Sequence, residues 1–177
     1  FGGSSAFFFL FESVSSSVDA IPPFAESDFT VEFWMYYLRE ANIFDAATEN
    51  LVGFLPSSLP SERLMIRLDS SISGTLQVEM VDGSTTSGFI TTSITKTNLR
   101  DRWAHIAFVR QGTSFKLYVD GTLAGSVTYS ASFAIQSTLT IGKLPGGGNY
   151  YRGHIDELRI SDSAVYTANF TPPTSPF

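Results

Sequence analysis

The chain has 177 residues, of which 43% are hydrophobic and 16% charged, and it contains 16 Phe and no Cys. This composition is too apolar for a disordered segment and too poor in charge for a helix bundle, and the lack of cysteine excludes a disulfide-stapled mini-protein. A net charge of -6 argues against partners such as nucleic acid or anionic lipid. The apolar run at 6–11 is far shorter than the roughly 20 residues of a membrane-spanning helix, so we expect no membrane partner.

Apolar and polar residues alternate with a period of two along the chain, between turn residues such as Gly, Ser, Asp and Pro. No segment longer than about ten residues keeps the spacing of an amphipathic helix. We therefore predict an all-β protein. The predicted strands lie at 29–38, 63–69, 75–81, 88–93, 103–110, 114–120, 123–129, 138–142 and 154–161, with a tenth at 6–11.

Two turns predict a meander over 103–129: the run Gln111-Gly112-Thr113 and the pair Asp120-Gly121, which is a strong hairpin signal. The strand at 29–38 carries large apolar side chains on both faces, so we expect it to lie centrally in one of two packed sheets. Each sheet is expected to have at least five strands. The side chains predicted to be largely buried are Phe33, Trp34, Trp103, Phe108, Tyr118 and Leu158.

Three stretches carry a family resemblance: FTVEFWMY at 29–36, WAHIAFVRQGTSFKLYVDG at 103–121 and LTIGKLPGGGNYYRGHIDELRIS at 139–161. In this order they resemble the laminin-G-like, concanavalin A-like superfamily. The resemblance implies an antiparallel two-sheet β-sandwich, a jelly roll, which we expect to span residues 1–170. The closing run VYTANFTPPTSPF, at 165–177, is similar to the C-terminal signature of such domains in tailed-phage virion proteins.

Enzymes of the family use paired carboxylates, and the chain offers one tight cluster, Glu26, Asp28 and Glu32. Its spacing departs from the E-x-D-x-E and E-x-D-x-x-E patterns of those enzymes. His105 has no second histidine nearby in the sequence and no G-x-S-x-G elbow is present, so we interpret it as a structural histidine. We predict that the protein is not an enzyme and that Glu32 is dispensable for any activity.

Asp156 is expected to share a face with His154, Leu158 and Ile160, pointing toward apolar surroundings. A buried carboxylate needs donors or a cation, and we favour backbone N–H donors that lock the last strand. Calcium is the weaker alternative, with Asp45, Asp69, Asp82 or Asp162 as further ligands if loops converge. No cofactor is otherwise expected, and the opening FGGSSAF lacks the Asp of the family's F-D-G-x-x-x-Y pattern.

Asn149, Tyr150 and Tyr151 follow a triple glycine and are candidate ligand-binding residues, because tyrosine rings stack on sugars and loops carry binding in such folds. The alternative is that both tyrosines pack on the sheet. The tail at 171–177 is rich in proline, so we expect it to run extended over a surface rather than to form a central strand. Pro172, Pro173 and Phe177 are candidate assembly residues that would dock into a neighbouring subunit, unless the tail folds back over its own sheet.

From these observations and the resemblance, we expect a non-enzymatic structural or adhesion module of a virion, in a capsid decoration, tail or fibre protein. Its partners would be copies of itself, other virion proteins and host-surface glycans, and its location the virion surface. The alternative is a lectin-like domain of a secreted carbohydrate-active enzyme, or a glycoside hydrolase.

Overall fold

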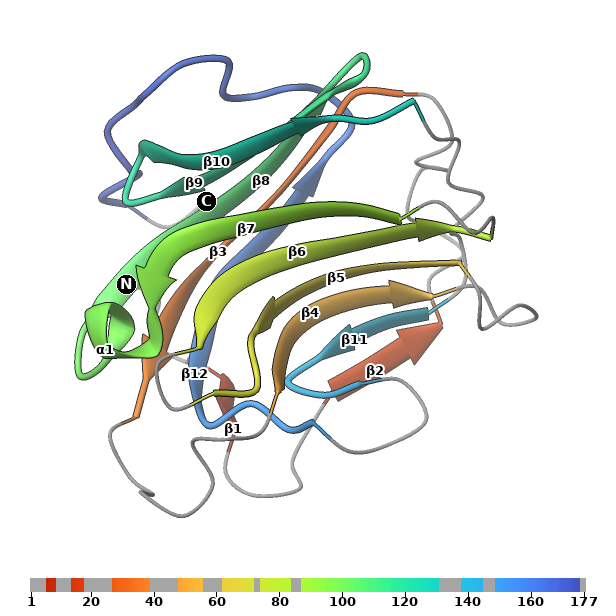
Figure 1. The fold of residues 1–177 in the computed structure, drawn as a ribbon. Coiled ribbons are helices and arrows are strands. Elements are labelled where there is room, and N and C mark those ends of the chain that lie inside the picture. The colour runs from red at the N-terminus through yellow and green to blue at the C-terminus, as the bar shows by residue number, and fades with distance from the viewer. Residues whose placement is uncertain are drawn as a thin grey trace.

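The computed structural model describes residues 6–8, 14–17, 27–38, 48–55, 62–71, 74–83, 87–130, 138–144 and 149–175. Two six-stranded antiparallel sheets pack face to face (Figure 1). Sheet A has the order β1 (Ala6–Phe8), β12 (Gly153–Ser161), β3 (Phe29–Tyr37), β8 (Trp103–Gln111), β9 (Ser114–Val119), β10 (Thr122–Thr128). Sheet B has the order β2 (Val14–Ser17), β11 (Thr138–Ile141), β4 (Glu49–Leu55), β5 (Glu62–Leu68), β6 (Thr75–Asp82), β7 (Ser87–Thr95). The predicted all-β sandwich is confirmed.

The core lies between the sheets and follows the alternation of the strands. In β3 the odd-numbered residues from Phe29 to Tyr37 face inward and are at most 1% exposed. They meet alternate residues of β5 and β6 in sheet B, namely Leu64, Ile66, Leu68, Leu76, Val78 and Met80. Because β3 lies between β12 and β8, its predicted central position is confirmed.

The prediction of six largely buried side chains is confirmed for Phe33, Phe108 and Tyr118, which are at most 1% exposed. Trp34 and Trp103 are only partly buried, because both lie on the face of sheet A that points away from the core. Leu158 is also only partly buried, against the margin of the core. For these three residues the predicted extent of burial was too high.

The nine predicted strands are present with boundaries that shift by one or two residues. The sequence reading missed two strands, β4 and β2, of which β4 lies within sheet B between β11 and β5. Of the predicted strand at 6–11, residues 6–8 form β1, and residues 9–11 lie outside the described part of the chain. The one helix within the described residues, α1 (Lys96–Leu99), follows β7 directly.

The Asp120-Gly121 turn joins β9 to β10 as predicted, since Val119 pairs with Thr122 across it. Both turn residues have positive φ, 50° and 74°, which is the conformation of the hairpin turns favoured by Asp-Gly. Gly112 has a φ of 58° in the turn between β8 and β9. The predicted meander is therefore confirmed.

The C-terminal segment, defined here as residues 162–175, runs back along the outer side of β8, β9 and β10 (Figure 1). Its Tyr166 and Phe170 rings stack with centroids 3.5 Å apart and pack on Tyr118 and its neighbours in β8 and β9. The Phe170 N–H donates to the Gly121 carbonyl at 2.9 Å. This half of the outer face of sheet A is thus covered by the chain's own end.

A bulge in β12 breaks the alternation of the last strand. Asp156 pairs with Trp34, but the register shifts before Arg159, and Glu157 takes a φ of 52°. As a result Asp156 lies on the outer face, while Leu158 and Ile160 pack against the core. The expectation that Asp156 shares a face with Leu158 and Ile160 was wrong, because a bulge adds a residue that a simple period of two does not anticipate.

Replacing Gly121 with alanine should destabilise the domain much more than replacing Gly112. Both have positive φ, which costs a non-glycine residue about 1–2 kcal/mol. A Cβ at Gly112 meets nothing within 4 Å, whereas one at Gly121 would lie 1.9 Å from the Phe170 carbonyl oxygen. We expect about 1–3 kcal/mol more for Gly121→Ala, measured by urea unfolding; equal losses for the two variants would contradict the close packing of the C-terminal segment.

Asp156→Ala should lower the free energy of unfolding by about 1 kcal/mol. The Asp156 side chain is largely buried and its Oδ1 accepts the N–H of Glu157 at 2.9 Å, which fixes the bulge. Asp156→Asn, which keeps an acceptor oxygen, is the matched control and should lose less. Unchanged unfolding of the alanine variant would show that the bulge does not need this contact.

Candidate functional site

Glu32, the carboxylate weighed for catalysis, is completely enclosed. It lies on the outer face of β3, and no part of its side chain is exposed. Its Oε1 accepts the Arg159 Nε and Nη2 protons at 2.8 and 2.5 Å, and its Oε2 accepts from the Tyr166 hydroxyl at 2.7 Å and from His105 Nε2 at 3.2 Å. The C-terminal segment therefore seals Glu32 and His105 away from any substrate.

The charge state of Glu32 fits a structural role. Burial alone would raise its pKa, but the hydrogen bonds from His105, Tyr166 and Arg159 and the Arg159 charge outweigh burial and hold the pKa below its ordinary value. Burial and the Glu32 carboxylate in turn raise the pKa of Tyr166. Asp28 lies elsewhere, accepting the Gly112 N–H at the β8–β9 turn, and Glu26 lies outside the described residues.

The loop predicted to bind ligand divides into a surface part and a core part. Tyr151 is fully buried, stacks on Tyr37 and donates its hydroxyl to the Tyr36 carbonyl at 2.8 Å. Asn149 is exposed, with its carbonyl accepting the Asn50 N–H at 3.0 Å, and Tyr150 is half-buried. Within this trio, only Asn149 and Tyr150 are placed to meet a ligand.

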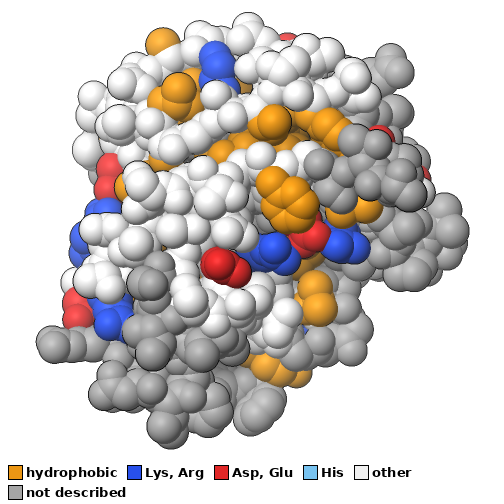
Figure 2. Space-filling view, in the orientation of Figure 1, with side chains coloured by type: hydrophobic (Ala, Val, Ile, Leu, Met, Phe, Trp, Pro, Cys, Tyr) orange, Lys and Arg blue, Asp and Glu red, His pale blue; other side chains and the backbone are white. Residues whose placement is uncertain are grey.

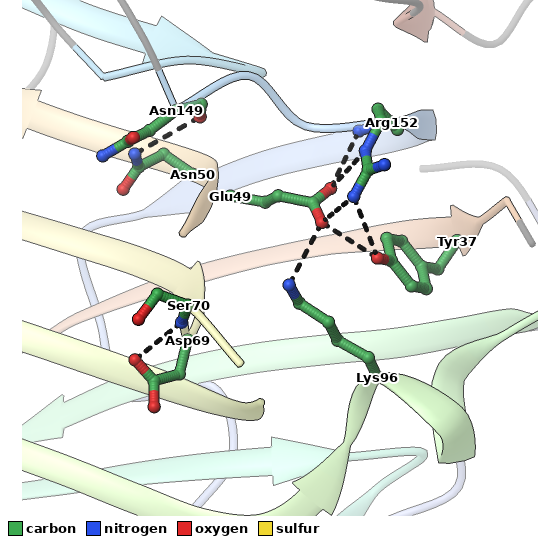
Figure 3. A network of polar contacts seen from close by, with 8 residues as sticks. All are labelled: Tyr37, Glu49, Asn50, Asp69, Ser70, Lys96, Asn149 and Arg152. Atoms are coloured by element: carbon green, nitrogen blue, oxygen red, sulfur yellow. Dashed lines mark hydrogen bonds and ion pairs between the residues drawn. The ribbon is translucent and has the colours of Figure 1, made fainter. Parts of the chain in front are cut away.

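Arg152, which follows the loop residues Asn149 and Tyr150, belongs to a buried ionic network (Figure 3). Glu49, at the start of β4, accepts from Arg152 at 2.6 Å and from the Tyr37 hydroxyl at 2.9 Å, and pairs with Lys96 at 3.3 Å. Lys96, Tyr37 and Glu49 are at most 1% exposed and Arg152 is 6% exposed. The network has no access for a ligand, and its arrangement points to a structural role at the end of the sandwich.

The remaining predicted residues are dispersed. Asp156 accepts the Glu157 N–H. Among the described residues, no group of three or more His, Cys, Asp or Glu side chains could hold a metal, so Asp156 belongs to no such group. Pro172 and Pro173 are half-buried, with Pro172 beside Gly121. Phe177 and Asp45 lie outside the described residues. Calcium binding and docking by the tail stay predictions.

The outer face of sheet B carries a set of side chains that the sequence reading did not single out. Because Leu64, Ile66 and Leu68 face the core, Arg63, Met65 and Arg67 of β5 face outward. Glu79 of β6 pairs with Met65 on one side and with Phe89 of β7 on the other. The register thus brings one carboxylate, two arginines and one aromatic ring to adjacent positions on three strands.

The contacts on this face are direct. Arg63 Nη2 donates to Glu79 Oε1 at 2.5 Å, and Arg67 Nη1 donates to Glu79 Oε2 at 2.7 Å. The Arg67 guanidinium lies 5.9 Å from the Phe89 ring centroid, within the range of a cation–π contact. Phe89 is 44% exposed. Figure 2 views sheet B from outside and shows hydrophobic, basic and acidic side chains together at the middle of this face.

We call these four residues, Arg63, Arg67, Glu79 and Phe89, the sheet B platform. An exposed ring on the outer face of a sheet offers an apolar surface, and guanidinium groups beside it offer hydrogen-bond donors. This pairing suits a ligand with both apolar faces and polar groups. The sequence carries a signal for the β5 part only, because R-x-M-x-R places two arginines on one face of a strand whose other face is aliphatic. The positions of Glu79 and Phe89 follow only from the register.

Acidification should unfold the domain partly through Glu32. Since its folded-state pKa lies below the ordinary value of 4.5, the ionised carboxylate stabilises the fold above that pH, and this contribution is lost as the pH falls through the folded-state pKa. Glu32→Gln should lower stability at pH 7 by about 3 kcal/mol and flatten its dependence on pH below 4.5.

Tyr166→Phe is the control for that measurement, because it removes one hydrogen bond and should cost about 1 kcal/mol while leaving the carboxylate. Urea unfolding at several pH values measures both variants. If Glu32→Gln and the wild type show the same pH dependence, the folded-state pKa of Glu32 does not lie below its ordinary value.

Comparison with known proteins agrees with this architecture. The family model of the concanavalin A-like lectin/glucanases superfamily matches residues 13–169. A search of curated protein sequences finds no significant match. Within the described residues, there is no helix of the length and hydropathy that a membrane crossing requires.

The chain is similar to many solved structures, and three of them show the range. The carbohydrate-binding module CBM40 of a Ruminococcus gnavus IT-sialidase, bound to α2,3-sialyllactose, has a TM-score of 0.65 at 10% identity, with 92% of this chain and 94% of that one covered. The binding domain of botulinum neurotoxin serotype G has a TM-score of 0.66 at 10% identity, covering 92% and 40%. A heptameric SAP-like pentraxin from Limulus polyphemus has a TM-score of 0.58 at 20% identity, covering 81% and 67%.

At these identities the likeness to solved structures concerns the fold, whereas the family model covers most of the sequence. Two six-stranded antiparallel sheets, packed face to face, are the architecture expected from that family match. The chain belongs to the concanavalin A-like lectin/glucanase superfamily.

Proposed function

We propose that the chain is a non-catalytic carbohydrate-binding module that binds its ligand on the sheet B platform. The observation that carries this proposal is the 44% exposure of Phe89 beside the Arg67 guanidinium. A sugar ring presents C–H groups on one face and hydroxyl groups at its edge. An aromatic ring flanked by arginines matches both features. The CBM40 neighbour, which is bound to sialyllactose, supports a sugar as the ligand.

A non-catalytic role is supported by the burial and the hydrogen bonds of two carboxylates, Glu32 and Glu79. Glu32 is sealed and both of its oxygens accept hydrogen bonds. Glu79, the carboxylate of the platform, is bound by two arginines and only 8% of its side chain is exposed. Glycoside hydrolysis needs two carboxyl groups on either side of the scissile bond. The platform supplies one carboxylate, already neutralised.

The wider setting we propose is adhesion at the surface of a virion, in which many copies of the module meet host glycans. The similarity of 165–177 to a signature of tailed-phage virion proteins supports this setting. The alternative, a lectin-like domain of a secreted carbohydrate-active enzyme, would use the same platform. Assembly through Pro172, Pro173 and Phe177 belongs to the virion proposal. Electron microscopy of the assembled particle tests it, and absence of the chain from the particle would contradict it.

Asn149 and Tyr150 form a second candidate contact, since Asn149 is exposed and lies in a loop. The two candidates are separable because they lie in different elements, a loop before β12 and the faces of β5–β7. Tyr150→Ala should leave binding intact if the platform is the site. Loss of binding in Tyr150→Ala alone would move the site to the loop.

Phe89→Ala should abolish binding to the glycans that the wild type selects on a glycan array, because it removes the stacking surface. Leu123→Ala is the matched control, since Leu123 is a large hydrophobic side chain with the same 44% exposure, on β10 of the other sheet. Both variants should keep the wild-type melting temperature within a few degrees, because neither side chain is in the core. Equal binding by Phe89→Ala and the wild type would refute the platform as the site.

A further inference from the structure

The hydrogen-bonding groups of the sheet B platform are unevenly used, and this bears on the kind of sugar that would bind there. The inference rests on the proposed function. Glu79 is the acceptor of the platform, and each of its oxygens already accepts a proton from an arginine. With 8% of its side chain exposed, it has little left to offer a ligand hydroxyl. The platform is therefore poor in acceptors.

Donors, in contrast, remain available. A guanidinium carries five N–H groups, and the contacts with Glu79 use one nitrogen of Arg63 and one of Arg67. The side chains of Arg63 and Arg67 are 34% and 24% exposed. The Arg67 Nε lies below the surface and has no hydrogen-bond partner. Because this nitrogen is enclosed, a ligand reaches Arg67 through the exposed part of its side chain.

The charge of the platform, like its free donors, favours a ligand that accepts hydrogen bonds and carries negative charge. Two arginines face one glutamate, although the chain as a whole carries a net charge of -6. Asp69 lies two residues beyond Arg67 at the end of β5, where its Oδ1 accepts the Ser70 N–H. Phe89, Gln77 and Thr91, the outward residues nearest to Glu79 and Arg67 on β6 and β7, are uncharged. The cationic centre thus lies between Arg63, Arg67 and the Phe89 ring.

We propose that the platform selects saccharides that carry an oxyanion, a carboxylate or a sulfate, with the anion held by Arg67 and the adjoining sugar ring stacked on Phe89. A neutral hydroxyl can accept from Arg67, but both oxygens of Glu79 are already engaged by arginines and do not take its proton in return. An oxyanion brings only acceptors. It also matches the fork of a guanidinium, which can donate two parallel hydrogen bonds to it.

The test is a glycan array that holds matched sets of one saccharide in neutral, carboxylated and sulfated form, followed by titration of the members that bind. The wild type should bind acidic members at least about tenfold more tightly than their neutral parents. The carboxylated and sulfated sets decide between the two sources of the anion. Raising NaCl from 0.05 to 0.5 M should weaken binding to the acidic members more than to neutral ones.

Arg67→Gln should remove the preference for acidic members, and Arg67→Lys should restore only part of it, because lysine keeps the charge and loses the fork. Phe89→Ala should weaken neutral and acidic members alike. Melting temperatures identify any variant that fails to fold, and in that case the salt dependence of the wild type decides. Leu123→Ala is again the control.

The outcomes separate this inference from the proposed function. If neutral and acidic members bind equally and Phe89→Ala abolishes both, the proposed function stands and the inference is wrong. A preference for acidic members that survives Arg67→Gln also overturns the inference. Absence of binding to every saccharide on the array overturns both.

Discussion

One end of the sandwich is held together by the contacts of a single buried carboxylate, that of Glu49. This single group joins β4 of sheet B to Tyr37 of sheet A, to Lys96 in α1 and to Arg152 just before β12. All four side chains are buried. Removal of Glu49 would take the carboxylate partner from two buried cations, which costs about 3–5 kcal/mol. The ends of the two sheets, the helix and the approach to the last strand are therefore fixed together.

The two outer faces of the sandwich are put to different use. On sheet A the C-terminal segment packs over β8 and β9 and closes the Glu32 cluster. On sheet B the middle strands leave Phe89 and two arginines at the surface. The first arrangement uses its charged groups internally, and the second presents them to solvent beside an aromatic ring. The second arrangement is the one on which the proposed binding site rests.

The sequence predicted what local alternation and turn chemistry determine: the all-β class, the central position of 29–38 and the hairpin at Asp120-Gly121. It did not predict the enclosure of Glu32, because Arg159 and Tyr166 lie 127 and 134 residues away along the chain. It misplaced Leu158 and Ile160 relative to Asp156, since the bulge at Glu157 has no signal in a period of two. The platform could not be predicted as a whole, because its residues come from three strands and become neighbours only through the strand register.

The position of β3 has a consequence for the order in which the chain acquires structure. Its two neighbours in sheet A are β8 and β12, and the pairing with β12 joins Thr30 to Ser161. During synthesis the centre of this sheet must stay incomplete until nearly the whole domain has been made. Closing such long loops is slow. Until the sheet is complete, the aromatic strand FTVEFWMYY has an unpaired edge that is prone to associate with other chains. Sheet A is thus completed only when β12 reaches β3.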